Sequence, residues 1–473
     1  MPVFLALDQG GHASRAIVFD AAGRKIDEAF APIATRRDGD DRVEHDGDEI
    51  VASLHLCIGE VARRHGDIAA AGLATQRSSM VCWDRRDGRP LSPVLSWQDR
   101  RNAAWLKQFE DRGAWIRERT GLVLTPHYGA SKMRWCLENL PAVQAASHAG
   151  HLAMGPLASF LANRLARERP FVADPANAAR TQLWDPHSRD WSPELVALFD
   201  IPRDCLPESV TSRYGYGAIE VGAQAIPLTV VTGDQSAVPF AFGTLDAATA
   251  WVNVGTGAFA QRAIRGHLPD APRLLASVVW SDADGVDYML EGTVNGGGSA
   301  LAAFATDAGI DLRESLAALE REAGAAEPPL FINTVAGLGS PYWSSAVAPH
   351  FIGDGDTQQR LLAVLESIAF LLTVNLRELA PHGPPLQRII LTGGLSASAA
   401  FARRLAALAG APVWCSDETE ATARGLAQLV ATPAEPWDPG PGRWIRPAPD
   451  TGLAARFERW CHELDAGLAR AGR

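Results

Sequence analysis

The sequence predicts an α/β protein of two domains, and three observations support that prediction. The chain has 473 residues, more than one ordinary hydrophobic core accommodates. Short apolar runs of strand length alternate with longer segments of helical periodicity. The opening pattern of a strand, a Gly/Asp turn and a second strand returns near the middle of the chain. We therefore expect a first domain over residues 1–241 and a second over residues 242–473.

The first half is predicted to fold as three strands, a helix and a fourth strand. Apolar or β-branched runs that stop at Gly, Asp or Asn mark the strands, and a helix is recognised by apolar residues every three to four positions. The strands are expected at residues 3–7, 15–20, 25–30 and 69–74, with turns at 8–11 and 22–24, a helix at 48–65 and a polar loop at 75–79.

The second half is predicted by the same signals. Its Pro-, Gly- and Trp-rich stretch, residues 433–449, is expected to be an extended surface segment. Strands are expected at residues 228–232, 248–253, around Arg262 and at 388–392, and helices at 298–308, 358–379 and 453–471.

Composition narrows the class of protein. Apolar residues make up 47% and charged residues 21%, the profile of a soluble globular protein. The net charge of -11 argues against nucleic acid or an anionic membrane surface as the partner. No CxxC pair or zinc spacing occurs, so the six cysteines are expected to be buried free thiols. The start lacks a basic segment, and the apolar run 361–374 contains Glu366, so we expect a cytoplasmic protein.

Two aspartates are candidates for chemistry. Asp8 and Asp234 each directly follow a buried strand, where backbone N–H groups of the next turn are exposed. Either one alone is also explained as an ordinary turn residue. Together they offer one carboxylate for a metal ion and one that takes a proton from an attacking hydroxyl.

Two glycine turns are candidates for phosphate contact. Gly255-Thr256-Gly257 follows a strand, so its amides and hydroxyl can converge on phosphate oxygens, and Gly393-Gly394 lets a flat ligand approach the backbone. Taken alone, each is a weak signal and is more typical of a structural turn. No GxxxxGK[ST] segment or protein-kinase motif is present, so neither the P-loop fold nor the protein-kinase fold is supported.

Taken in order, these and further segments resemble the FGGY family of carbohydrate kinases, most closely its glycerol kinase branch. The resemblance covers nearly the whole chain. It is carried by residues 8–10, 14–20, 43–46, 96–101, 131–135, 177–181, 233–235, 255–257, 337–343, 393–398 and 418–423.

The resemblance implies two ribonuclease-H-like, actin-like ATPase domains around a central cleft, and ATP-dependent phosphorylation of a hydroxyl of a small polyol or sugar with Mg²⁺. Asp234 is the implied general base, and Asp8 with Asp234 the implied metal ligands. The implied acceptor residues are Gln76, Arg77, Ser78, Trp97, His127, Asp234 and Gln235. The implied nucleotide residues are Gly10, Gly11, His12, Arg15, Gly255, Thr256, Gly257, Gly298, Gly393, Gly394 and Ser398. Family habit also implies a homodimer or homotetramer.

The chain departs from the family pattern at three places. Ser78 stands where glycerol kinases have a Glu that grips a glycerol hydroxyl, and His127 stands where they have a Tyr. Sites built to hydrogen-bond particular hydroxyls discriminate by about 10⁴-fold, so we expect an acceptor larger than glycerol. Gly11-His12-Ala13 replace hydroxyl residues, and each lost hydrogen bond to phosphate is worth roughly 1.5–3 kcal/mol.

Two alternatives stay open from the sequence. Ser78 and His127 could still hold glycerol through water, which would make the chain a glycerol kinase proper. The altered first loop could also belong to a catalytically impaired regulator that binds sugar or nucleotide without turnover. The presence of both Asp8 and Asp234 favours catalysis.

Overall fold

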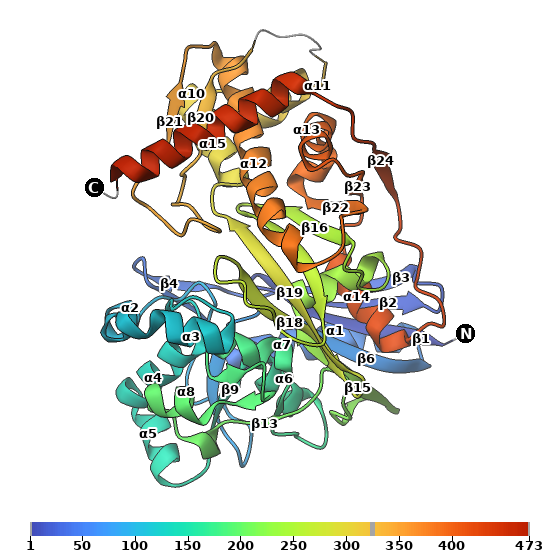
Figure 1. Ribbon diagram of the computed structural model, residues 1–473. Coiled ribbons are helices and arrows are strands. Elements are labelled where there is room, and N and C mark those ends of the chain that lie inside the picture. The colour runs from blue at the N-terminus through green and yellow to red at the C-terminus, as the bar shows by residue number, and fades with distance from the viewer. Residues whose placement is uncertain (1, 322–326, 472–473) are drawn as a thin grey trace.

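The computed structural model describes residues 2–321 and 327–471, and two large mixed sheets organise it (Figure 1). The first sheet has the strand order β14-β15-β6-β1-β2-β3. Strands β1, β6 and β15 run parallel, while β1, β2 and β3 form an antiparallel meander. The strands are β1 Val3–Gln9, β2 Ala13–Asp20, β3 Lys25–Pro32, β6 Ile68–Thr75, β14 Ala218–Val221 and β15 Gln224–Gly233.

The second large sheet has the order β18-β19-β17-β16-β22-β23-β24. Its strands β19, β17 and β16 pair antiparallel, with β18 outside β19, and β22 and β23 then add in parallel to β16, so the centre of this sheet repeats the plan of the first. The duplication suggested by the two similar openings is therefore present in the topology. The strands are β16 Thr249–Val254, β17 Ala258–Arg265, β18 Leu275–Asp282, β19 Gly285–Val294, β22 Arg388–Gly393, β23 Val413–Ser416 and β24 Gly442–Ile445.

Smaller sheets complete the strand set. A five-stranded sheet in the order β4-β5-β8-β7-β9 lies beside the first large sheet. Three further sheets have two strands each, namely β10-β13, β11-β12 and β20-β21. Their strands are β4 Arg36–Asp38, β5 Arg42–His45, β7 Met80–Asp84, β8 Val94–Leu95, β9 Leu152–Pro156, β10 Val172–Ala173, β11 Trp184–Asp185, β12 Asp190–Trp191, β13 Glu208–Ser209, β20 Leu330–Ile332 and β21 His350–Ile352.

The helices fall into two groups that follow the two lobes of Figure 1. One group, α1 to α8, belongs to the lower lobe with the first sheet, and α10 to α13 with α15 belong to the upper lobe. The helices are α1 Gly47–Arg64, α2 Ala103–Leu106, α3 Gly113–Thr120, α4 Gly129–Asn139, α5 Pro141–His148, α6 Leu157–Leu165, α7 Pro175–Ala178, α8 Pro193–Leu198, α9 Asp234–Ala237, α10 Gly298–Ala308, α11 Leu312–Arg321, α12 Thr357–Leu379, α13 Ala399–Ala409, α14 Ala421–Ala431 and α15 Thr451–Ala471.

Helix α14 packs across both parts of the chain. It follows the second sheet's strand β23, yet it lies against β6 and β1 of the first sheet and against α9. Gly72 of β6 makes this possible, because a Cβ there would lie 2.7 Å from Val430 and 2.8 Å from Leu426. This packing joins the two sheets near the ends of β1 and β15.

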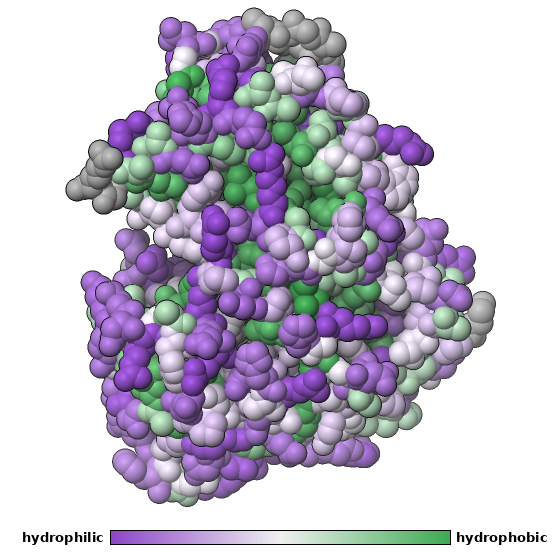
Figure 2. All heavy atoms as spheres, in the orientation of Figure 1, coloured by the Kyte–Doolittle hydropathy of each residue, from purple (hydrophilic) through white to green (hydrophobic). Residues whose placement is uncertain are grey.

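Helix α12 is the one helix in the described residues that is long and apolar enough to span a membrane, and it is mostly buried inside the protein. Its interruption, Glu366, is buried and paired with Arg456 of α15 at 2.5 Å. The expected core helix is confirmed. Figure 2 shows that the face seen in Figure 1 is mostly hydrophilic, with apolar side chains in smaller patches.

The predicted elements agree with the structure. Residues 433–449 were expected to form an extended surface segment; they are exposed or half-buried except at Trp437 and include the extended strand β24, whereas Trp437 is buried with its ring 6.2 Å from Phe19. An indole buries a large apolar area, which keeps this stretch on the protein. The cysteines are free, as expected, and all but the half-buried Cys461 are fully buried.

Candidate active site

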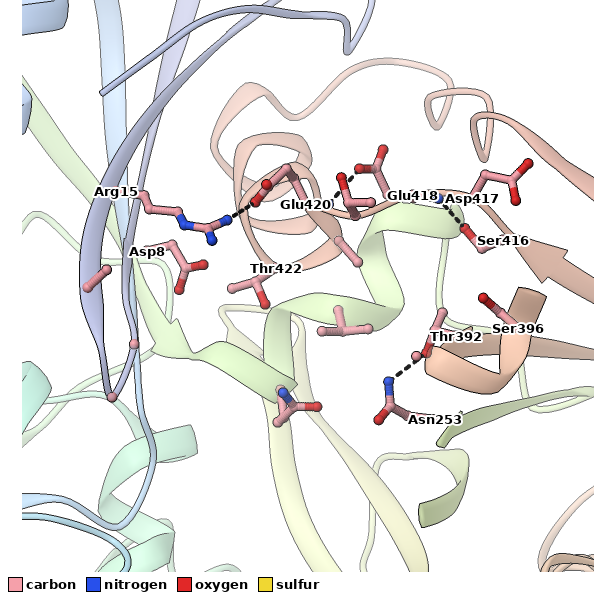
Figure 3. A pocket seen from close by; sticks show the side chains of 18 of the residues that line it. Asp8, Arg15, Asn253, Thr392, Ser396, Ser416, Asp417, Glu418, Glu420 and Thr422 are labelled. Carbon is pink, nitrogen blue, oxygen red and sulfur yellow. Dashed lines mark hydrogen bonds and ion pairs between the residues drawn. The ribbon is translucent and has the colours of Figure 1, made fainter. Parts of the chain in front are cut away.

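A cavity of about 720 Å³ lies between the two large sheets. The first sheet contributes Asp8 and Arg15, and the second contributes Asn253 and Thr392 near the carboxyl ends of β16 and β22 (Figure 3). In sheets of this kind, ligands bind outside the carboxyl ends of the parallel strands. The loop after β23 closes the far side with residues 416–422.

Asp8 lies in β1, and Asp234 begins α9 directly after β15; both of these strands flank β6. Asp8 pairs in register with Ala74 near the end of β1, and Gly233, just before Asp234, pairs with Thr75 at the end of β15. Both carboxyls are therefore at one edge of the first sheet. Burial, together with the negative charge of Asp234, raises the pKa of Asp8 to about 7. Burial also raises the pKa of Asp234, which Arg77 partly opposes.

This pair of carboxyls fits a magnesium ion. Mg²⁺ in phosphate-transfer sites keeps several waters and takes only one or two carboxylates besides the phosphate oxygens. Burial and the negative charge of Asp234 raise the proton affinity of Asp8, and such a carboxyl is suited to a cation that replaces the proton. The described residues contain no cluster of three or more His, Cys, Asp or Glu that would form an all-protein metal cage.

The first loop lines the cavity from the side of the first sheet. Gly10, Gly11, His12 and Arg15 all line it, as does Gly393 from the second sheet. The Arg15 guanidinium donates to the Glu420 carboxylate at 2.5 Å, which joins residues of the two sheets' loops across the cavity (Figure 3). Arg15 is 38% exposed in its side chain, so a phosphate can reach it.

The second glycine turn lies beside this cavity rather than in its lining. Gly255 and Thr256 are exposed, and they follow Asn253, which does line the cavity. The turn is held against the start of α10, because the Gly298 amide donates to the Gly255 carbonyl at 2.8 Å. Gly257 belongs to the same turn, since its carbonyl accepts from the Gly255 amide at 2.9 Å.

Two further nucleotide candidates lie just past β22. Gly394 is exposed and begins a short 3₁₀ turn, and Ser398 caps α13. The Ser398 hydroxyl accepts from the Phe401 amide at 3.2 Å and donates to Glu320 at 2.7 Å. Neither residue lines the cavity, and the Ser398 hydroxyl already has partners.

Three of the predicted acceptor residues, Gln76, Trp97 and His127, are linked by hydrogen bonds through Ser79, and together with Ser78 they are called the acceptor group. The Gln76 amide donates to the Gln9 carbonyl at 2.9 Å, which attaches this group to the first loop. The Ser79 hydroxyl donates to the Gln76 side chain at 3.0 Å and accepts from the Trp97 amide at 3.0 Å. His127 Nδ1 lies 3.1 Å from the Trp97 carbonyl.

Arg77 connects this acceptor group to Asp234. Its Nε lies 3.8 Å from the Asp234 carboxylate, and its side chain crosses Gly233, where a Cβ would lie 2.5 Å from it. Burial and the neighbouring Arg180 lower the pKa of Arg77 to about 10. The exposed Gln235 follows Asp234, and its amide donates to the Asp234 carboxylate at 2.7 Å.

Several residues at the site were missed by the sequence analysis. Asn253, Thr392 and Glu420 line the cavity, and Asn253 donates to the Thr392 hydroxyl at 2.9 Å. The available signal was a polar residue at the end of each parallel strand. Buried Lys132 bonds to carbonyls of the acceptor group, and no local pattern marks that contact.

Known protein sequences are similar to this chain over most of its length. Residues 3–253 match the model of the N-terminal domain of the FGGY family of carbohydrate kinases, and residues 250–433 match that of its C-terminal domain. A glycerol kinase of Alkalilimnicola ehrlichii is 35% identical over 445 residues, covering 91% of this chain and 90% of that protein. A glycerol kinase of Bordetella parapertussis is 34% identical and covers 98% of this chain and 97% of that protein.

Solved structures share the fold. A Plasmodium falciparum glycerol kinase with ADP has a TM-score of 0.90 at 22% identity, covering 99% of this chain and 98% of that chain. A xylulose kinase from Rhodospirillum rubrum has a TM-score of 0.87 at 20% identity, with coverage of 99% and 98%. The expected two-domain α/β fold of actin-like type is confirmed.

Proposed function

Since the chain belongs to the FGGY family of carbohydrate kinases, we propose that Asp234 is the base that takes the proton of the acceptor hydroxyl. The enzyme transfers the terminal phosphoryl group of ATP, with Mg²⁺, to a hydroxyl of a small polyol or sugar. The observation that supports Asp234 is its place at the end of β15, between the acceptor group through Arg77 and the nucleotide cavity through Gln235.

The proposed step transfers the γ-phosphoryl group of ATP to the acceptor hydroxyl. The acceptor oxygen forms a bond to the γ-phosphorus of ATP while its proton passes to the Asp234 carboxylate. The bond from that phosphorus to the bridging oxygen breaks, and ADP leaves. An alcohol is a weak nucleophile, so a positioned carboxylate contributes chiefly by orienting it and receiving its proton.

Asp8 and Asp234 are proposed to hold Mg²⁺, which, when bound, offsets the charge of the transferring phosphate. Burial raises the pKa of each carboxyl, and a bound cation would favour the ionised form of both. Arg77, whose guanidinium faces Asp234, is proposed to keep that carboxylate ionised and aimed at the acceptor.

The nucleotide is proposed to lie along the cavity between the sheets. Arg15 and the backbone of Gly10 and Gly11 face its phosphates from the first loop, with His12 beside them. The second sheet's proposed contacts are Gly255, Thr256, Gly257, Gly298, Gly393, Gly394 and Ser398, of which Gly393 lines the cavity.

The acceptor is proposed to be a polyol or sugar larger than glycerol. Gln76, Ser78, Trp97 and His127 lie on the loops of the acceptor group, and Ser78 is a short, half-buried side chain in the left-handed region at φ 65°. A short side chain leaves room that a Glu would fill. The similarity to glycerol kinases favours the second candidate, glycerol itself.

Other properties are proposed from the family. The first domain is placed at residues 1–241 and the second at residues 242–473. The enzyme is proposed to work in the cytoplasm, where ATP is available, as a homodimer or homotetramer.

The first test is ADP release from Mg-ATP with glycerol, erythritol, pentitols, ketopentoses and ketohexoses. Asp234→Ala is expected to lower kcat by about 10²–10⁴-fold, the usual contribution of a general base, while ATP binding is retained. Asp307→Ala, at an exposed position on α10, is the matched control and should behave as wild type.

The outcomes of this test distinguish the role of Asp234 and the candidate functions. Turnover that depends on Asp234 establishes the base and names the acceptor class. Near-normal kcat in Asp234→Ala removes Asp234 as the base. Strongest turnover on glycerol would make the enzyme a glycerol kinase proper, and silence on the whole panel despite ATP binding would support a ligand-binding regulator.

A further inference from the structure

Lys132 is a buried cation at the back of the acceptor group. Its side chain reaches from the first turn of α4, and it is 1% exposed. Its ammonium donates to the carbonyls of Ser78 at 3.1 Å, Ser96 at 2.7 Å and His127 at 2.7 Å. A lysine ammonium has three donors, so these three carbonyls use all of them.

The three carbonyls belong to three separate loops. Ser78 is in the turn after β6, Ser96 precedes Trp97 after β8, and His127 precedes α4. Each loop carries one of the proposed acceptor contacts, namely Ser78, Trp97 and His127. Lys132 therefore fastens together the loops from which the acceptor pocket is built.

Stability alone does not account for a cation here. Among the residues that the structure describes, no carboxylate lies within 4.0 Å of the Lys132 ammonium, so it has no ion-pair partner. Burial lowers its pKa to about 7, with attraction from Asp99 only partly opposing this and Arg101 adding to it. A positive charge in the first turn of a helix is also disfavoured by the helix dipole.

The small number of lysines in the chain also singles out Lys132. The chain has 44 Lys and Arg residues together, of which only Lys25, Lys107 and Lys132 are lysines. Lys25 and Lys107 are exposed, so Lys132 is the one lysine buried in this strongly arginine-biased protein. The compact ammonium can face three carbonyls in different directions, whereas the planar guanidinium presents its donors in one fixed fork.

We propose that Lys132 is a positioning residue that sets the shape of the acceptor pocket by holding the backbone of its three loops at Ser78, Ser96 and His127. This inference rests on the proposed acceptor site. It makes Lys132 a determinant of which polyol is accepted, acting through backbone that touches the substrate's contacts rather than through the substrate itself.

The test separates an effect on the acceptor site from an effect on the nucleotide site. Lys132→Met keeps the length and removes the donors, and it should lower kcat/KM for the best acceptor by about 10- to 100-fold, the effect of misplacing a reacting group by about 1 Å. The acceptor KM should increase. The ATP KM should change by less than about threefold, because Lys132 does not line the nucleotide cavity. Lys107→Met is the matched control.

A second variant and a second measurement guard against a folding defect. Lys132→Arg keeps the charge, and it should show the same acceptor-selective loss because the fork does not match the three carbonyls. Lysine-selective ¹⁵N labelling of the wild-type enzyme yields only three side-chain signals. The Lys132 signal should shift on addition of the best acceptor from the panel, and Lys25 and Lys107 should not.

The outcomes are distinguishable from those of the proposed function. Unchanged acceptor KM in Lys132→Met, or equal changes in both KM values, overturns the positioning role while leaving the kinase intact. A Lys132 signal that does not shift when the acceptor binds also overturns the positioning role. Absence of turnover in the wild type overturns the acceptor assignment instead, and a Lys132 shift with a non-reacting polyol would still support the positioning role.

Discussion

Replacing Gly425 by Ala should disturb the active site from the far side of α9. Gly425 lies in α14, and α14 packs against α9, the short helix that begins with Asp234 and ends with Ala237. A Cβ at residue 425 would lie 2.0 Å from the Ala237 carbonyl oxygen and 3.0 Å from the Ala241 amide. The contact is backbone to backbone, so no flexible side chain can move out of the way.

The size of the effect follows from the geometry. Cβ contacts shorter than 3.0 Å essentially do not occur, so α9 and α14 must separate by about 1 Å. Overpacking of this kind costs roughly 1–3 kcal/mol of unfolding free energy. A displacement of about 1 Å at a group that orients the substrate lowers the rate by about 100-fold. We expect kcat to fall by that order, together with a lower Tm.

The assay is ADP release at saturating ATP and acceptor, with Tm measured on the same samples. Gly59→Ala is the matched control, because Gly59 lies within α1 and a Cβ there meets no atom within 4 Å. That variant should gain up to about 1 kcal/mol from helix propensity and keep its activity. A Gly425→Ala enzyme with wild-type kcat and Tm would refute the claim that this contact positions Asp234.

Two further predictions concern the acceptor and the metal. Ser78→Glu should raise the kcat/KM of glycerol relative to larger polyols by about 10-fold or more, since a new hydrogen-bonding group selects for its own hydroxyl; an unmoved preference in the same panel would show that residue 78 does not line the pocket. Because the pKa of Asp8 is raised to about 7, the carboxyl is protonated below that pH, and Mg²⁺ must displace the proton. Calorimetry should show Mg-nucleotide affinity falling by about tenfold per pH unit below pH 7, and Asp8→Asn should bind more weakly and lose this dependence. Affinity that is flat between pH 5 and 8 in the wild type would contradict Asp8 as a ligand.

Much of the local structure could be predicted because it depends on short-range sequence patterns. The strand β1 was expected at residues 3–7 and spans Val3–Gln9, and α10 was expected at the residues where it occurs. The placement of Asp8 and Asp234 at strand ends also followed from local pattern, since an apolar run that stops at Asp and Gly is visible in the sequence. Sequence reasoning did not predict the burial of Trp437 within the extended segment 433–449, because that burial depends on a distant partner, Phe19.

The sequence by itself determined the fold class, the family and the two aspartates, because strand and helix periodicity and the turns that end strands depend on neighbouring residues. Only the tertiary structure decided which distant groups meet. It pairs Arg15 with Glu420 across 405 positions, brings α14 onto the first sheet, and sets the Lys132 ammonium among three loops. Contacts of this kind depend on how packed layers approach one another, and no local propensity encodes that distance.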